Sequence, residues 1–238
     1  MSAKKNLDAD AQKKIAAEAA LKFISSGMKV GLGTGSTANH FIKALGAKVS
    51  QGFDVVGIPT SKATMELAQS LGINIGSLED HPFLDVVIDG ADEIDPEFRL
   101  IKGGGGALLI EKIVGSSARQ LVIIADQSKQ VKKLGKFPLP VEIVALGVKA
   151  TAWKLERVFK MVDLAPQMTL RVKDGKPFRT DMGNLIIDCA CGELKQPDRL
   201  EVMLNNLPGV VNNGLFVGMA SFALIGKADG TVQELVRK

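Results

Sequence analysis

The sequence contains few of the side chains on which several classes of protein depend. Among its 238 residues there are no tyrosines, one tryptophan, two histidines and two cysteines. Binders of single-stranded nucleic acid stack bases on aromatic rings, so the shortage of aromatic residues argues against that class. His40 and His81 are too few for a multi-histidine metal site. We therefore expect no nucleic-acid partner and no bound metal.

Long apolar segments are also missing. No window reaches ~18 consecutive apolar residues, so no transmembrane helix is expected. Residues 1–20 are charged and lack the apolar centre of a signal peptide. Cys189 and Cys191 are two residues apart in an alternating apolar run, which indicates thiols lining a core and not a disulfide. These features predict a cytoplasmic protein without a membrane partner.

Glycine is the residue type in excess. The chain has 25 glycines, about 10% of its residues against a usual ~7%. The hydrophobic content of 46% and the charged content of 24% are ordinary for a globular protein. The formal net charge of +4 fits a compact anion such as a phosphate monoester better than it fits a nucleic acid.

The order of apolar and amphipathic segments predicts two domains. Buried strands alternate with helices as far as Lys136, which is typical of a Rossmann-like, mostly parallel α/β sheet flanked by helices. Phe137-Pro138-Leu139-Pro140 then indicates a rigid linker, followed by a β-α-β-β-α-β order typical of a smaller ferredoxin-like α+β domain. We expect a Rossmann-like catalytic domain at 1–136 plus 212–238, and the ferredoxin-like domain at 137–211.

A glycine-rich loop follows the first predicted strand. Residues 31–37, Gly-Leu-Gly-Thr-Gly-Ser-Thr, open a helix whose first N–H groups can bind an anion. Ser36 stands where the dinucleotide fingerprint needs its third glycine, and no Lys-Ser/Thr pair completes a nucleotide P-loop. The loop therefore predicts an anion site, with an ordinary strand–helix turn as the alternative.

Four carboxylates lie within seven residues after a fully apolar predicted strand. In Asp89-Gly90-Ala91-Asp92-Glu93-Ile94-Asp95, the side chains of Asp89 and Asp92 can converge across a Gly-Ala turn. Carboxylates accept strong hydrogen bonds from sugar hydroxyls. Helix capping within a solvated acidic loop is the alternative, and the spacing breaks the pattern of a hard-cation loop.

Lys102 precedes four consecutive glycines at 103–106, directly before a predicted helix. Each glycine costs roughly 0.5–1 kcal/mol in chain entropy relative to alanine, so such a run indicates backbone amides that line a ligand. Glu111 follows on the apolar face of the helix, where desolvation is expected to raise the pKa of its carboxyl group. A raised pKa suits a general base that works near neutral pH. A buried salt bridge, for example with Lys102, is the alternative for Glu111.

The predicted functional loops meet at one edge. Residues 31–37, 89–92 and 126–129 all follow predicted parallel strands, and that edge of an α/β sheet is where ligands bind. Lys129, in the last of these loops, can contact a phosphate as a point charge.

Several motifs resemble the type A ribose-5-phosphate isomerase family. They are Gly-Thr-Gly-Ser-Thr at 33–37, Asp-Gly-Ala-Asp-Glu at 89–93, Lys-Gly-Gly-Gly at 102–105 with Glu111 nine residues after the lysine, and Asp-x-Ser-Lys at 126–129. Residues 135–142 and 208–211 are also similar to that family, so the resemblance covers nearly the whole chain.

The resemblance implies an enzyme that interconverts D-ribose 5-phosphate and D-ribulose 5-phosphate through an enediolate, in the non-oxidative pentose phosphate pathway. It implies no metal or organic cofactor and a homodimer or homotetramer. Glu111 would be the general base, with Asp89, Asp92 and Lys102 as further catalytic residues. The substrate would contact Thr34, Gly35, Ser36, Thr37, Asp89, Gly90, Ala91, Asp92, Lys102, Gly103, Gly104, Gly105, Lys129 and Lys13.

Elementary chemistry agrees with the isomerase activity that the resemblance implies. Two other functions remain as alternatives. An aldose–ketose isomerisation needs a base that moves a proton between adjacent carbons, and donors for the enediolate oxygens, but no hydride acceptor. A non-catalytic sugar-phosphate sensor would not need a buried Glu111. A coenzyme A transferase would use such a glutamate as a nucleophile and form a covalent thioester.

Overall fold

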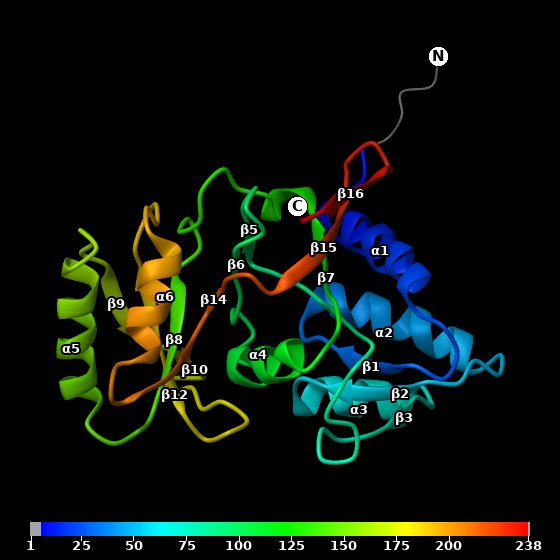
Figure 1. Cartoon of the computed structure of the whole chain (residues 1–238), viewed down its shortest axis with the longest axis horizontal. Coiled ribbons are helices and arrows are strands. Elements are labelled where there is room, and N and C mark those ends of the chain that lie inside the picture. The colour runs from blue at the N-terminus through cyan, green and yellow to red at the C-terminus, as the bar shows by residue number, and fades with distance from the viewer. Residues whose placement is uncertain (1–5, 238) are drawn as a thin grey trace. The chain divides into compact units, whose positions relative to one another are not determined.

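The computed structural model describes residues 6–237 of the chain (Figure 1). Its largest sheet has seven strands in the order β16-β15-β7-β4-β1-β2-β3, and each neighbouring pair is parallel except β15 with β16. The predicted mostly parallel α/β sheet is therefore confirmed. Its strands are β1 (Lys29–Leu32), β2 (Val56–Pro59), β3 (Asn74–Ile75), β4 (Val86–Asp89), β7 (Leu121–Asp126), β15 (Ala220–Gly226) and β16 (Val232–Val236).

Helices cover both faces of this sheet. Val30 of β1 packs with Phe41 in one apolar core, to which the first three helices contribute. Alternate strand residues point to opposite faces, and a side chain on Gly31 would touch Val87 and Val114 on the other face, where the fourth helix packs. The helices are α1 (Ala9–Ala19), continued by the 3-10 turn η1 (Ala20–Phe23), then α2 (Ser36–Val49), α3 (Lys62–Ser70) and α4 (Leu108–Ser116).

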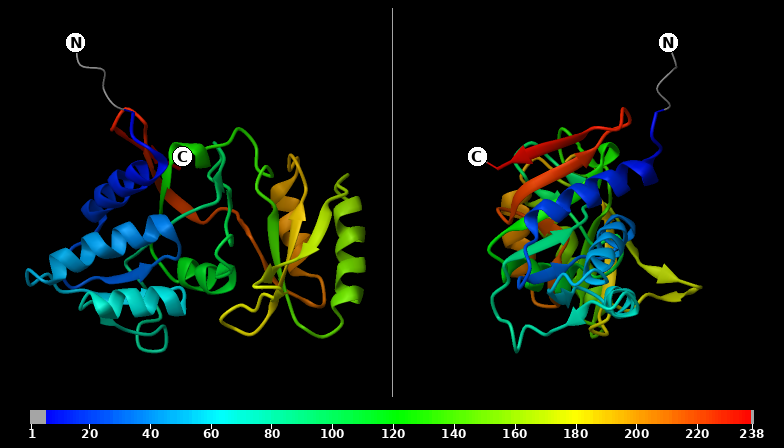
Figure 2. Two further views of the ribbon diagram at one scale, coloured as in Figure 1. Left: turned by 180° about the vertical axis from the view of Figure 1, so that it is seen from behind. Right: turned by 90° about the vertical axis from the view of Figure 1, so that its right-hand side faces the viewer.

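The C-terminal strands return to the first sheet, as expected from the sequence. Both views of Figure 2 show the blue α1 alongside the orange β15 and red β16. Residues 215–218 were expected to return with them, but they begin with β14 (Leu215–Phe216), which pairs antiparallel with β6 (Leu100–Ile101).

A second, four-stranded sheet is antiparallel, in the order β13-β8-β12-β9. With its two helices the chain order is β-α-β-β-α-β, which is the predicted ferredoxin-like succession. The elements are β8 (Leu139–Ile143), α5 (Val148–Lys160), β9 (Gln167–Leu170), β12 (Leu185–Ala190), α6 (Pro197–Asn205) and β13 (Val210–Asn213), with a small hairpin of β10 (Val172–Lys173) and β11 (Lys176–Pro177) between β9 and β12.

The proline-rich segment is not a linker, contrary to the sequence-based prediction. Leu139 and Pro140 are buried residues of β8, and Leu139, Val141 and Ile143 enter the core of the second sheet. The register of β13 with β8 ends at Val141, and directly beyond it the Pro140 carbonyl oxygen accepts from the N–H of Gly214 at 2.8 Å. In an antiparallel strand the N–H and C=O of one residue face the same neighbour, so the N–H that Pro140 lacks would face Gly214, where the pairing ends, and the β12 ladder is not interrupted.

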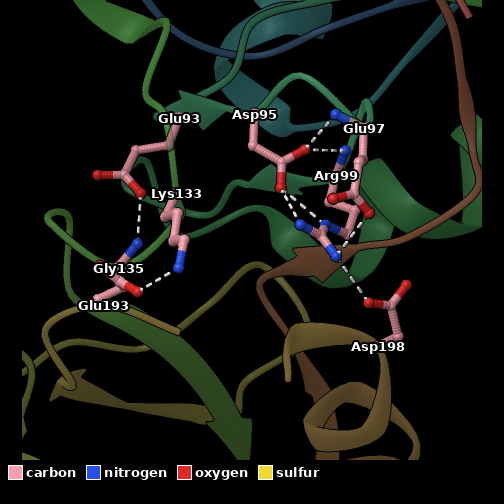
Figure 3. Close-up of polar contacts among 8 residues, drawn as sticks. All are labelled: Glu93, Asp95, Glu97, Arg99, Lys133, Gly135, Glu193 and Asp198. Carbon is pink, nitrogen blue, oxygen red and sulfur yellow. Dashed lines mark hydrogen bonds and ion pairs between the residues drawn. The ribbon is translucent and has the colours of Figure 1, made fainter. Parts of the chain in front are cut away.

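A short hairpin that begins within the acidic run of the sequence was not predicted. β5 (Glu93–Ile94) pairs with β6, and the turn between them is fixed by Asp95, which accepts from the backbone N–H groups of Glu97 and Arg99 at 3.0 Å each (Figure 3). The Arg99 Nε donates to Asp95 at 2.7 Å. Glu93 accepts from the N–H of Gly135 at 2.7 Å. Two of the four carboxylates of this run are therefore structural.

The chain divides into two compact units. One comprises residues 1–91, 110–130 and 219–238, and the other residues 92–109 and 131–218. Residues 92–109 belong to the second unit, in which β5 pairs with β6 and β6 pairs with β14. The sequence predicts different boundaries, namely one domain at 1–136 plus 212–238 and another at 137–211. These boundaries stay a prediction.

Candidate functional site

Three of the predicted loops lie at one edge of the first sheet. β1, β4 and β7 are parallel neighbours, with Leu32 beside Ile88 and Asp89 beside Ile123. The residues that follow these strands, 33–37, 90–91 and 127–129, therefore leave the sheet at its carboxyl edge. This confirms the predicted convergence of these segments within the first unit.

Asp89 fixes the backbone of two of these loops. Its side chain is completely buried, and its Oδ1 accepts from the N–H of Thr34 at 3.1 Å and from that of Gly90 at 2.7 Å. A Cβ on Gly33 would lie 2.1 Å from the same oxygen, so glycine is required for this close approach. The residue predicted to be catalytic thus also holds the glycine loop in place.

The hydroxyl of Thr34 is held by a network that the sequence analysis did not find. Its Oγ1 lies 2.7 Å from that of Thr60, 2.9 Å from Ser61 and 3.2 Å from Thr64. Thr64 in turn donates to the carbonyl oxygen of Gly33 at 2.9 Å. Thr60 and Ser61 follow β2, the parallel neighbour of β1, and that position was the available signal.

The start of α2 brings together groups that attract an anion. Gly35 precedes the helix with a φ of +106°, and Ser36 is exposed at the first helical position. The Lys13 Nζ from α1 donates to Ser36 Oγ at 3.1 Å, which brings a cation to these N–H groups. Thr37, half-buried, faces Gly90, whose Cβ position would be 3.9 Å from Thr37 Cβ. Helix dipole, hydroxyls and ammonium therefore all favour a phosphate here.

Lys129 is half-buried in a short 3-10 turn, η2 (Gln127–Lys129), directly after β7. Asp126 caps this turn by accepting from the Ser128 N–H at 2.9 Å. Gln12 of α1, next to Lys13, accepts from the N–H of Gln127 at 3.3 Å. The turn of Lys129 is thus tied to the helix that supplies Lys13.

Glu111 lies in the first turn of α4 and is 5% exposed. Val114, one turn later on the same side of the helix, packs against the Gly31 position on the sheet. After α4 the chain pairs Ala118 with Leu84 at the opposite edge of the sheet, so the start of α4 is directed to the carboxyl edge. This confirms that Glu111 belongs to the buried face.

The remaining predicted residues lie in the second unit. Asp92 Oδ2 accepts from the N–H of Gly104 at 2.8 Å. Lys102 is 3% exposed, and its ammonium lies 5.5 Å from the ring centroid of Phe216. Gly103, with a φ of +101°, begins the turn, whereas Gly104 and Gly105 are exposed. Asp92 and the glycine run are thus brought together.

Arg171 is a further residue of the second unit that contacts the predicted glycine run and that sequence reasoning missed. It donates to the carbonyl oxygens of Gly103 and Gly104 from 68 and 67 residues away along the chain. The residues around Arg171 form no motif that points to a glycine loop so distant in sequence.

Residues 6–237 hold no group of three or more His, Cys, Asp or Glu side chains with the proximity that a metal ion needs. Among the helices described, none combines the length and apolar character that crossing a membrane requires.

Comparison with known proteins identifies the family. The model of ribose 5-phosphate isomerase A (phosphoriboisomerase A) matches residues 56–230. Ribose-5-phosphate isomerase A of Parvibaculum lavamentivorans is 53% identical over 94% of this chain and 98% of its own, and that of Sinorhizobium fredii is 47% identical over 94% and 97%.

Solved structures agree with the sequence relatives. Ribose 5-phosphate isomerase from Plasmodium falciparum superposes with a TM-score of 0.92 at 39% identity, covering 96% of this chain and 99% of its own. A D-ribose-5-phosphate isomerase in complex with phospho-erythronic acid gives 0.90 at 40% identity, covering 97% and 100%. The chain therefore belongs to the ribose 5-phosphate isomerase A family.

Proposed function

We propose that this protein interconverts D-ribose 5-phosphate and D-ribulose 5-phosphate. The observation that carries the proposal is the placement of Glu111, a carboxylate 5% exposed on the sheet-facing side of α4 and directed to the carboxyl edge. Relatives that are 45–53% identical are named ribose-5-phosphate isomerase A, and one related structure holds phospho-erythronic acid.

The phosphate of the substrate binds at the start of α2 in this proposal. Gly35, Ser36 and Thr37 supply N–H and hydroxyl donors, and Lys13 reaches Ser36. Lys129 adds a second cation. The backbone of Thr34 contributes while its hydroxyl stays bound to Thr60, Ser61 and Thr64.

The sugar end of the substrate contacts the acidic and glycine-rich segments. Asp89 and Asp92 accept hydrogen bonds from sugar hydroxyls and relay their protons. Lys102 and the amides of the glycine run stabilise the negative oxygen of the enediolate. Gly90, Ala91, Gly103, Gly104 and Gly105 contribute backbone contacts.

The chemistry balances with one base and a hydroxyl relay. Glu111 removes the proton from C2 of the open-chain aldose, the electron pair forms the C1–C2 double bond, and the negative charge moves to O1. The same carboxyl returns the proton to C1, while the proton of the O2 hydroxyl passes to O1 and leaves the C2 carbonyl of the ketose. A buried carboxylate on a rigid helix suits this transfer, because its position changes little between the two steps.

Assembly, location and cofactor use are parts of the same proposal. We expect a homodimer or homotetramer that acts in the cytoplasm within the non-oxidative pentose phosphate pathway. Two free thiols, Cys189 and Cys191, fit a reducing compartment. The protein's own donors suffice for the chemistry, so turnover is expected without a metal or organic cofactor.

The deciding assay is the formation of ketopentose from ribose 5-phosphate by the purified protein in a chelating buffer. Turnover under these conditions supports the proposal. Strict dependence on an added metal ion, or no turnover of either pentose 5-phosphate, would contradict it.

A further inference from the structure

Arg171 braces the glycine loop, defined here as residues 103–106, through two backbone carbonyls. Its Nη1 donates to the oxygen of Gly103 at 2.8 Å and to that of Gly104 at 3.2 Å. Its Nε donates to Asp188 on β12 at 2.8 Å, and Nη2 donates to the other carboxylate oxygen, so the pair is bidentate. The Arg171 side chain is 14% exposed, which limits competition from water.

Phe178, in the segment that follows Arg171, contacts the same glycine loop. Its N–H donates to the carbonyl oxygen of Arg171 at 2.8 Å, and its ring centroid lies 5.9 Å from the Arg171 guanidinium carbon. A Cβ on Gly106 would lie 2.4 Å from the ring, which places the ring directly against the loop backbone. A fixed cation and an aromatic ring therefore support one side of the loop.

Peptide geometry directs the N–H groups on the far side of the same two peptide units away from Arg171. In a planar trans peptide, the carbonyl of one residue and the N–H of the next point in opposite directions. Since the carbonyls of Gly103 and Gly104 point to Arg171, the N–H groups of Gly104 and Gly105 point away from it. The Gly104 N–H accordingly donates to Asp92 on the other side. Gly105 is exposed, so a ligand beside Asp92 can reach its N–H.

We propose that Arg171 is a positioning residue for the isomerisation, because it holds the Gly105 N–H as a donor to the oxygen that becomes negative in the enediolate. This inference rests on the proposed function. Arg171 acts through the two peptide groups and does not touch the substrate. Its positive charge polarises both peptides and strengthens their N–H donors. Loss of one preorganised oxyanion donor costs about 10²–10³ in kcat.

The test compares R171A, R171K and R179A, with thermal unfolding of each. Arg179 is a matched control, because it directly follows Phe178 and its guanidinium donates to the carbonyl oxygen of Gly183 at 2.8 Å. We expect R171A to lower kcat about 10²-fold with little change in KM, because the donor acts in the transition state. R171K stays impaired, since one ammonium does not replace a planar guanidinium that serves two carbonyls and a carboxylate.

Chemical rescue separates positioning from a merely structural role. Guanidinium at millimolar, non-denaturing concentrations should restore part of kcat in R171A, and should not raise kcat in wild type or R179A. Wild-type kcat in R171A would overturn the inference, as would a loss that guanidinium does not restore. If wild type itself shows no isomerase activity, the proposed function fails; if wild type is active and R171A matches it, the role of Arg171 alone fails.

Discussion

Replacing Gly33 with alanine tests how closely the first glycine loop and Asp89 are packed. The new Cβ would lie 2.1 Å from Asp89 Oδ1 and 2.6 Å from Asp89 Cα, so side-chain rotation alone does not relieve the contact. Overpacking of this kind costs about 1–3 kcal/mol. The displaced carboxylate also weakens its hydrogen bonds to two N–H groups, each worth about 1.5–3 kcal/mol.

We therefore expect G33A to lose about 2–5 kcal/mol of unfolding free energy, which lowers Tm by roughly 5–15 °C in a chain of this size. The matched control is G90A on the other side of Asp89, where the nearest atoms would be 3.9 Å from a Cβ and φ lies outside the left-handed region. That variant should change stability by less than about 1 kcal/mol. Calorimetry measures both, and a G33A Tm equal to that of G90A would refute the packing argument.

Two further predictions concern the second unit. Burial raises the pKa of the Cys191 thiol to about 12. Burial, with smaller contributions from the charges of Cys191 and Asp188, raises the pKa of the Cys189 thiol well above its usual value. Alkylation of both thiols at pH 8 should therefore be roughly 10³-fold slower in the folded protein than in denaturant, and rapid labelling of either folded thiol would contradict this. Arg99→Met leaves the fully buried Asp95 carboxylate without its cation (Figure 3) and should cost about 3–5 kcal/mol in urea unfolding. As a control, Asp198→Ala removes a 58% exposed partner of Arg99 and should cost at most about 1 kcal/mol of unfolding free energy. Equal losses of unfolding free energy in the two variants would contradict the prediction that the buried Arg99–Asp95 pair matters most.

The sequence predicted the order of elements well because the strands of the first sheet are short apolar segments. β4 and β7 are buried along their whole length, so their apolar runs needed no tertiary context to be recognised. Pro138 and Pro140 wrongly predicted a linker, since local rules treat closely spaced prolines as a break in structure. The burial of Leu139, Val141 and Ile143 outweighed that tendency, and this depends on partners far away in the chain.

Candidate functional residues were predicted where they form local motifs and missed where they do not. Residues 33–37, 89–92 and 102–105 are contiguous, whereas Arg171 reaches Gly103 across 68 positions. Likewise, the clustering of Thr60 with Thr34 follows from the register of β2 beside β1. Contacts of this kind depend on strand pairing, which a single sequence does not determine.

In the proposed reaction, Glu111 moves the proton between C1 and C2. The most direct test of this role is the kcat of Glu111→Gln, a change that keeps the shape of the side chain and removes the base. We expect kcat to fall about 10²–10⁴-fold, with an unchanged Tm and with binding of ribose 5-phosphate retained in titration calorimetry. Isomerisation by this variant at the wild-type rate would contradict this role of Glu111.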